Sequence, residues 1–338
     1  MYVEYDKQKY SSEFQSFIEN IYRHDGVEGI ANCLPFIEEA FAVTVDGKFA
    51  AANDRFLSLV GYDRGELYGK DIDLVIYSDD VNKVRNRLDE GSLDSYQIRL
   101  RTRGGDIRHV IISPNLITID GVDYRLAQFI DYTRLVTLQK NKLTALRKTA
   151  AAISNMIESR DPYTYGHMHR TAEIAVEIAR KMTLKDEALD AIYLAASIHD
   201  IGKISIPLEI LIKPGKLEAF EWEHIRVHPV TGHRILKDIE FDKVIKQIVL
   251  MHHEYQDGSG YPDGKSGEDI PIEVAIVTAA DCLEAIAGIR PYHQANTFET
   301  ALEIMKRESA KFHKDVLSIV DSLITTGELT GREYGLQI

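Results

Sequence analysis

The run Ala195-Ala196-Ser197-Ile198-His199-Asp200-Ile201-Gly202-Lys203 places an imidazole, a carboxylate and an ammonium group within five positions. Apolar residues recur at helical spacing before this run and Gly202 interrupts the pattern, so a helix is predicted to end at His199 and Asp200. A buried, unpaired aspartate costs several kcal/mol, and the His-Asp pair is therefore expected to bind a cation. Alone, such a pair is more often an exposed helix end, so the interpretation depends on further ligands.

Polar side chains at the ends of other apolar helical segments supply these ligands. His167 shares a helix face with Ile174 and Ile178, and it is expected to point inward. The remaining candidates are His228, the adjacent pair His252 and His253, and Asp281. Any one of these histidines alone could be an ordinary core residue that hydrogen-bonds to a backbone carbonyl. With His199 and Asp200 the set comprises five histidines and two aspartates, and together they indicate a metal centre.

From about Ile153 to Phe312 the chain resembles the HD-GYP domain, a bacterial branch of the HD phosphohydrolases. The resemblance implies an all-helical domain that holds two or three metal ions, usually iron or manganese, and hydrolyses cyclic di-GMP to the linear dinucleotide pGpG, to GMP, or to both. The matching stretches are Arg160-Asp161-Pro162-Tyr163-Thr164 with His167, His199-Asp200-Ile201-Gly202-Lys203, His228-Pro229 with Gly232, His252-His253-Glu254, Asp257-Gly258-Ser259-Gly260-Tyr261-Pro262-Asp263-Gly264, Ala280-Asp281 and Arg290-Pro291-Tyr292.

The same resemblance implies roles for individual residues. Asp200 would bridge two ions and Lys203 would lie near the scissile phosphate, so these two are the predicted catalytic residues. Relatives with a third metal carry a glutamate four positions before the first ligand histidine, where this chain has Tyr163, so two ions are predicted. The implied metal ligands are His167, His199, Asp200, His228, His252, His253 and Asp281, and the implied substrate contacts are Lys203, Gly260, Tyr261, Pro262 and Arg290.

Elementary chemistry supports a binuclear hydrolase independently of the resemblance. Two divalent ions about 3.5–4 Å apart lower the pKa of a bridging water, so that hydroxide exists near neutral pH, and they stabilise the entering and leaving oxygens. Lys203 adds a point positive charge where charge accumulates on the phosphoryl oxygens. The nitrogen-rich donor set suits iron, manganese or zinc better than magnesium or calcium.

The segment from Asp257 to Gly264 contains three glycines and Pro262, which predicts an irregular loop directly after the histidine pair. The loop is therefore expected to lie over the site. Tyr261 within it either stacks on a guanine of the substrate or packs as an ordinary turn residue.

The chain departs from the family pattern around Arg290. His293 and Gln294 follow where basic residues are usual, and Phe312-His313-Lys314 replaces the usual Phe-Asp-Pro. Ala287, Gly288 and Ile289 replace the usual acid and hydroxyl. These departures leave two alternatives open. One is a phosphohydrolase of another cyclic dinucleotide or of a phosphorylated nucleotide, and the other is a catalytically weak receptor that binds cyclic di-GMP, or a diguanylate cyclase through its Gly260-Tyr261-Pro262 loop.

Length and charge limit the remaining classes. The 338 residues allow two ordinary domains, and a net charge of −13 disfavours binding to a nucleic-acid polymer or to an anionic membrane surface. Cys33 and Cys282 lie far apart in apolar contexts, which indicates free thiols and a reducing cytoplasm. Neither a membrane-spanning run nor a secretion leader is apparent.

The part before the HD-GYP-like region resembles a PAS domain, a sensory or dimerising module. A hairpin turning at Asp46-Gly47, a helix ending at Gly61-Tyr62, a second helix at about 79–88 and strands at 96–102, 107–119 and 124–131 carry this resemblance, together with Asn53, Phe56 and Gly69. The sequence does not identify a PAS ligand. His109 is a candidate haem ligand, although a histidine on an alternating strand is more often an ordinary strand residue.

The predicted architecture is a multidomain α+β protein. It consists of an N-terminal helical segment (1–33), a PAS-like α/β sensor domain (34–133), a connector helix (134–158), an all-α HD-GYP domain (159–326) and a loose tail (327–338). In the connector, Leu143, Leu146, Ala150, Ile153 and Ile157 form a heptad series. This series predicts a parallel two-helix connector in a homodimer, and the alternative is one helix that packs on its own chain.

Overall fold

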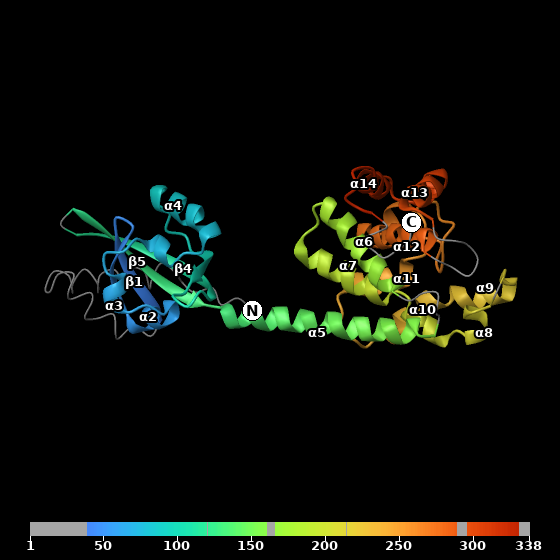
Figure 1. Ribbon diagram of the computed structural model, residues 1–338, viewed down its shortest axis with the longest axis horizontal. Helices are drawn as coiled ribbons and strands as arrows, with labels where there is room; N and C mark the ends of the chain where they lie inside the picture. Colours follow the sequence, from blue (N-terminus) through green and yellow to red (C-terminus); the bar gives the residue numbers. More distant parts are fainter. Residues whose placement is uncertain (1–38, 120, 161–165, 214, 289–295, 331–338) are drawn as a thin grey trace. The chain divides into compact units, whose positions relative to one another are not determined.

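The structure is a computed structural model that describes residues 39–330 except 120, 161–165, 214 and 289–295 (Figure 1). The predicted N-terminal helical segment, Cys33, Tyr163, Arg290, His293 and Gln294 lie outside the described residues. The chain divides into two compact units between Lys142 and Leu143. We call them the sheet unit and the helical unit and describe each by itself.

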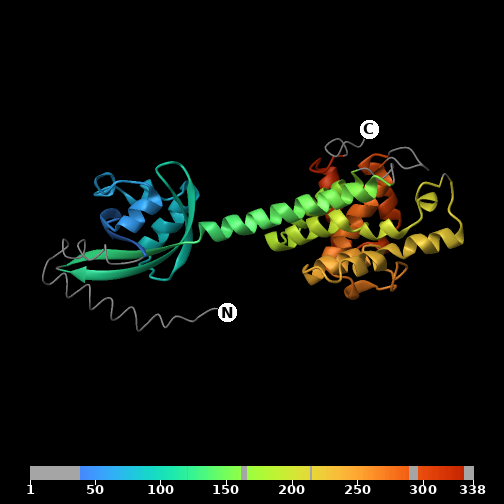
Figure 2. The same cartoon turned by 90° about the horizontal axis from the view of Figure 1, so that it is seen from below.

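The sheet unit contains a five-stranded antiparallel sheet with strand order β2-β1-β5-β4-β3. Strands β4 and β5 form a long hairpin, in which Ile112 pairs with Phe129 and Ile119 with Val122 (Figure 2). The inner face of the sheet and the helices enclose one core, where the Phe56 ring lies 4.6 Å from that of Phe129. The elements are β1 (Ala40–Val45), β2 (Lys48–Ala52), α2 (Asp54–Val60), α3 (Arg64–Leu67), α4 (Val81–Asp89), β3 (Tyr96–Arg101), β4 (Ile107–Ile119) and β5 (Val122–Asp131).

Asn53 joins the first helix to the sheet. Its side-chain oxygen accepts hydrogen bonds from the backbone of Phe56 at 3.0 Å and of Phe41 at 2.9 Å, and its amide donates to the Glu39 carbonyl. The side chain thus caps α2 and also pairs with β1, which explains an asparagine that is only 1% exposed. The predicted hairpin, helices and three strands are all confirmed, with shifts of one or two residues at their ends.

The regular elements of the helical unit are all helices in its described residues, as predicted, and loops connect them. Its core lies mainly between α6, α7, α11 and α12, whose apolar faces are almost fully buried. The elements are α5 (Thr133–Glu158), α6 (His167–Lys181), α7 (Asp186–Ile198), the 3₁₀ helix η4 (Ile201–Ser205), α8 (Leu208–Leu211), α9 (Ala219–Arg226), α10 (His228–Ile235), α11 (Lys243–Met251), α12 (Ile272–Ala287), α13 (Phe298–Arg307) and α14 (Lys314–Thr325).

Helix α5 covers the predicted connector, but its second half is not a separate segment. Ala150 and Ile157 are buried in the core of the helical unit, and Ile153 packs against that core. These residues of the heptad series therefore pack on their own chain, because the neighbouring helices cover their apolar face. Leu143 and Leu146 remain half-buried.

The segment after residue 326 begins differently from the predicted loose tail. Leu329 is only 1% exposed and belongs to the helical core. Its backbone N–H donates to the Leu323 carbonyl at 3.0 Å, and Gly327 makes the turn at φ +74° after α14. The start of the predicted loose tail (327–338) is therefore packed, because one apolar side chain at a helix end folds back onto the core, and residues 331–338 lie outside the described residues. Among the described helices, none is long and apolar enough to cross a bilayer.

Candidate metal centre

The central pair His199 and Asp200 lies at the C-terminal end of α7, in the interior of the helical unit. His199 is the C-terminal cap of α7 and Asp200 follows it, and the two residues are 1% and 3% exposed. Apolar residues of α7 bury the last turn of the helix, so the chain emerges from it inside the core. The predicted helix end and its burial are confirmed.

Backbone carbonyls orient three of the ligand candidates in the same way. Nδ1 of each ring hydrogen-bonds to the carbonyl three residues earlier, at 2.7 Å for His199, 2.7 Å for His228 and 3.0 Å for His252. Each Nδ1–H donates its hydrogen bond to the carbonyl oxygen, so the proton of the neutral ring is on Nδ1 and Nε2 presents a lone pair. Each of the three histidines stands at a helix end, where the backbone turn permits this contact.

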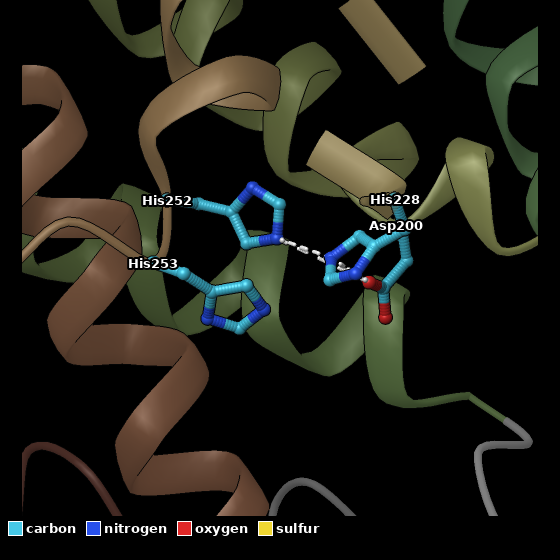
Figure 3. Close-up of side chains that lie close together, drawn as sticks. All are labelled: Asp200, His228, His252 and His253. Atoms are coloured by element: carbon cyan, nitrogen blue, oxygen red, sulfur yellow. Dashed lines mark hydrogen bonds and ion pairs between the residues drawn. The ribbon is translucent and has the colours of Figure 1, made fainter. Parts of the chain in front are cut away.

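The two oxygens of Asp200 face two groups of side chains. Oδ1 lies 3.2 Å from Nε2 of His228 and 4.0 Å from Nε2 of His252, with His253 beside them (Figure 3). Oδ2 lies 3.5 Å from Nε2 of His199 and 4.0 Å from Nε2 of His167. Asp200 therefore stands between the groups, as expected of a bridging carboxylate.

Asp281 completes the second group from α12. Its Oδ1 lies 3.1 Å from Nε2 of His167 and 3.7 Å from Nε2 of His199, and its Oδ2 lies 4.0 Å from Nδ1 of His253. All seven predicted ligands are thus brought together. They form two sets whose ligand atoms lie within 4.8 Å of one another, Asp200 with His228, His252 and His253, and His167 with His199 and Asp281.

Burial determines the charge of these groups. It lowers the pKa of His199 and His252, and it lowers the pKa of His253 to about 3, so the rings are neutral at pH 7. Burial alone would raise the pKa of Asp200, but the Lys203 ammonium, 2.6 Å from Oδ2, holds that pKa well below its ordinary value. The site therefore offers neutral nitrogens together with an ionised carboxylate.

The nitrogen and oxygen atoms that face one another in the site are suited to binding divalent cations. Nε2 of His228 and Nε2 of His252 are 3.1 Å apart. Neither Nε2 carries a proton in the neutral ring, because Nδ1–H of each ring donates to a backbone carbonyl. Asp200 Oδ1 is buried beside them and accepts no hydrogen bond from the described residues. Three acceptor atoms that face one another in a buried site repel unless a cation satisfies them. Imidazole and carboxylate donors in this ratio suit transition metals.

A carboxylate that sequence reasoning missed supports His167. Glu284 is 1% exposed, and its Oε2 contacts Nδ1 of His167 while its Oε1 accepts from Arg170 Nε at 2.8 Å. His167 is thus oriented by a carboxylate, whereas His199, His228 and His252 rely on carbonyls. The signal was available in the sequence, because Glu284 lies one helical turn after Asp281 on the same apolar helix.

The segment 257–264 is an irregular loop next to the site, as predicted. The buried Glu254 accepts hydrogen bonds from the backbone of Asp263 at 2.7 Å and of Lys265 at 3.0 Å, which ties the loop to the histidine pair. The Tyr261 ring lies 4.7 Å from the His253 ring, and the Arg226 guanidinium lies 5.5 Å from the Tyr261 ring centre. Tyr261 thus lines the wall beside His253, and a contact with a guanine stays a prediction.

Two glycines permit the close approaches that build the site. A Cβ atom on Gly202 would lie 1.9 Å from the His228 carbonyl oxygen, so only glycine lets η4 meet α10. A Cβ atom on Gly260 would lie 2.4 Å from the His253 carbonyl oxygen. Pro262 follows in the same loop, next to Tyr261. The predicted substrate contacts Gly260, Tyr261 and Pro262 therefore lie beside the ligands, and Gly260 also has a packing role.

Comparison with known proteins gives a family match for each of the two units. The sequence matches the HD domain family over residues 151–316 and the PAS domain family over residues 38–134. It is 41% identical over 158 residues to the cyclic di-GMP phosphodiesterase response regulator RpfG of Xanthomonas campestris pv. campestris (strain 8004), an alignment that covers 46% of this chain and 42% of that protein.

Two further relatives carry related names. The 3'3'-cGAMP-specific phosphodiesterase 3 of Vibrio cholerae serotype O1 is 38% identical, over 46% of this chain and 34% of that protein. A cyclic di-GMP phosphodiesterase of Thermotoga maritima is 37% identical, over 52% of each chain. The chain spans about a third to a half of the length of these relatives. The two folds, the buried centre and the family matches together establish that this chain carries a PAS domain followed by an HD domain.

Proposed function

We propose that the chain is a metal-dependent phosphodiesterase that hydrolyses cyclic di-GMP to pGpG, GMP or both. The observation that carries the proposal is the position of Asp200, whose two oxygens face two separate groups of histidines. Relatives named as cyclic di-GMP phosphodiesterases match the part of the chain that holds this centre. Two divalent ions bound there, with iron or manganese proposed, would lower the pKa of a coordinated water and stabilise charge on the phosphoryl oxygens.

The residues of the chain have distinct parts in this reaction. The seven ligands would hold the ions, and Asp200 would contact both. Lys203 keeps Asp200 ionised and is half-exposed, with 21% of its side chain accessible, so its charge can also face a phosphate. Tyr261 and Arg226 form a wall next to His253 that could bind a base of the substrate.

Hydrolysis of cyclic di-GMP by protein that is purified anaerobically and reconstituted with iron or manganese tests the proposal. We expect the Asp200→Ala variant to lose turnover and most of the bound metal. Full activity in that variant would exclude the proposed centre. Metal binding without turnover in the unchanged protein would favour a receptor role instead, including recognition of a diguanylate cyclase through the loop at Tyr261.

A second candidate substrate is 3'3'-cGAMP. It is favoured by the relatives of Vibrio cholerae that are named as specific for this dinucleotide, and by the unusual residues around Arg290. Competition between the two dinucleotides in one reaction, followed by chromatography, gives the ratio of kcat/KM directly. If kcat/KM for 3'3'-cGAMP is more than ten times that for cyclic di-GMP, 3'3'-cGAMP replaces cyclic di-GMP as the proposed substrate.

We further propose a cytoplasmic homodimer whose hydrolase is regulated by the PAS domain. Leu135, Leu138 and Met156 of helix α5 are 56%, 55% and 71% exposed, and they lie at heptad spacing. Cys282 has no disulfide partner among the described residues, which is in keeping with the proposed reducing compartment. In sedimentation, the double variant Leu135→Glu, Leu138→Glu is expected to be monomeric, and a dimer that persists in it would exclude this interface.

A further inference from the structure

The sheet unit contains a cavity whose lining residues are far in sequence from the metal ligands. A cavity of about 60 Å³ lies between the inner face of the sheet and helix α4. At about 10–15 Å³ for each water-sized group, it has room for about four to six such groups, which is too little for a nucleobase with its ribose. Its walls are apolar and include Phe49, Ile72, Val84, Leu100, Ile112 and Phe129.

Polar groups gather at one part of this cavity lining. Arg87 and Ser92 come from the end of α4 and the turn after it, Tyr96 from the start of β3, and Arg125 from β5. The Arg87 guanidinium lies 4.5 Å from the centre of the Tyr96 ring and donates to Ser92 Oγ at 3.0 Å. Arg125 donates to the carbonyl of Leu88 at 2.8 Å, at the end of α4. The alternation along β5 places Arg125 on the same sheet face as Ala127 and Phe129, which also line the cavity.

Neither of the two arginines has a carboxylate partner among the described residues, in contrast to several other arginines of this unit. Arg85, Arg99 and Arg103 each form an ion pair with a carboxylate. In the part of the chain that the structure describes, Arg87 and Arg125 instead donate to a hydroxyl and to backbone carbonyls. Burial raises the pKa of Tyr96 and both guanidinium charges oppose that rise, so both charges act at the same phenol. Two guanidinium groups with no carboxylate partner among the described residues therefore border an apolar cavity.

We infer that this cavity binds a small amphipathic carboxylate. The apolar tail lies among Val84, Leu100 and Phe129, and the carboxylate is held by Arg87 and Arg125. A cavity with apolar walls alone would accept any small apolar molecule, but two unneutralised guanidinium groups at its border select an anion. Guanidinium groups bind a planar carboxylate through paired, charge-assisted hydrogen bonds. The inference does not depend on the proposed hydrolase, because it uses only residues of the sheet unit.

Calorimetric titration of the full chain with hexanoate and with hexanamide tests the inference. The two probes share tail and shape, and only hexanoate is charged. We expect hexanoate to bind at least tenfold more tightly, because only its carboxylate can accept charge-assisted hydrogen bonds from the two guanidinium groups. Equal affinity of the two probes, or no binding of hexanoate at millimolar concentration, would overturn the inference. This comparison uses the unchanged chain and requires no variant to fold.

Substitution of the two arginines tests whether hexanoate binds at this cavity. Arg87→Gln and Arg125→Gln are each expected to weaken hexanoate binding at least tenfold and to leave hexanamide unchanged. Arg101→Gln is the matched control, because this exposed arginine of β3 does not line the cavity and its removal changes the net charge equally. Hexanoate affinity that stays unchanged in both cavity variants would overturn the inference, and it would also reveal binding of the carboxylate elsewhere, including at the metal centre.

Discussion

At the scale of single residues, the centre depends on which ring nitrogen carries a proton. Nδ1–H of His199, His228 and His252 donates to backbone carbonyls. The unprotonated Nε2 atoms therefore face Asp200 in the interior. An ordinary hydrogen-bonded core would pair donors with acceptors. Here acceptors face acceptors, and that mismatch is the physical reason to assign a metal site rather than a polar core.

Lys203 contacts the predicted metal ligand Asp200 but is not itself a predicted ligand. Its substitution can therefore distinguish stabilisation of transition-state charge from metal binding. Lys203→Ala is expected to lower kcat by about 10²–10³, the usual effect of removing one group that stabilises transition-state charge, and to leave bound metal nearly unchanged. Both quantities are measured on the same preparation. The exposed Lys216→Ala serves as the control for the loss of one positive charge. Parallel loss of metal and turnover would show instead that Lys203 positions Asp200.

Glu284 orients His167 from outside the ligand set. Glu284→Gln keeps the shape of the side chain but removes the carboxylate charge that Arg170 and His167 share. Loss of such a supporting carboxylate typically costs 10- to 100-fold in metal affinity, so we expect a decrease of that size in a competition with a chelator. The exposed Glu303→Gln is the control and should bind metal like the unchanged chain. Unchanged affinity in Glu284→Gln would show that this carboxylate has no role in metal binding.

At the scale of elements, the contact between η4 and α10 aligns His199 and Asp200 with His228. Gly202→Ala would place a methyl group 1.9 Å from the His228 carbonyl oxygen, so the helices must separate. We expect a loss of about 1–3 kcal/mol in stability and weaker metal binding, measured by thermal unfolding and metal analysis. Gly65→Ala is the matched control, because an added Cβ there meets no atom within 4 Å. Normal metal content in Gly202→Ala would mean that α10 adapts without moving His228.

In the sheet unit, Asp80 joins the start of α4 to strand β3. Its carboxylate accepts from the backbone N–H of Arg99 at 2.7 Å and from the guanidinium at 3.0 Å, and the pKa of Asp80 is lowered mainly by the side-chain hydrogen bond from Arg99. A folded-state pKa below the unfolded value means that this stabilisation is present above about pH 4 and is lost as pH falls through the folded pKa. Urea unfolding should therefore show Asp80→Asn less stable than the unchanged chain at pH 7, with the difference in stability decreasing as pH falls below about 4. A gap independent of pH would contradict the ionic origin.

At the scale of the whole molecule, the chain divides inside helix α5 rather than at its end. Ala150, Ile157 and the buried Glu158 belong to the helical unit, and Glu158 accepts hydrogen bonds from the backbone of Gly166 and Met168 at the start of α6. A fragment of residues 143–338 is therefore expected to unfold cooperatively and to bind metal. A fragment of residues 159–338 should lose both properties, because it exposes that core. Equal melting temperatures and metal contents for the two fragments would show that α5 is dispensable.

The elements themselves were largely predictable because they follow short-range rules. Turn residues such as Asp46-Gly47 and apolar spacing along the strands predicted the sheet unit to within two residues, and Asp200 emerged at a helix end as expected. Long-range neighbours were not predictable in the same way. The packing of Ala150 and the return of Leu329 onto the core depend on which surfaces other helices leave open, and local periodicity carries no information about that.

The sequence by itself therefore determined the two kinds of fold, their order and the seven ligand candidates, because helix ends, strand alternation and residue chemistry are local properties. The family resemblance implied a bridging Asp200, but only the tertiary structure showed which histidines face each of its oxygens and that Glu284 supports His167. It alone placed Arg87 and Arg125 together at the border of one apolar cavity. Each of these depends on atoms that are far apart along the chain and that come within a few ångströms only when the helices and strands pack.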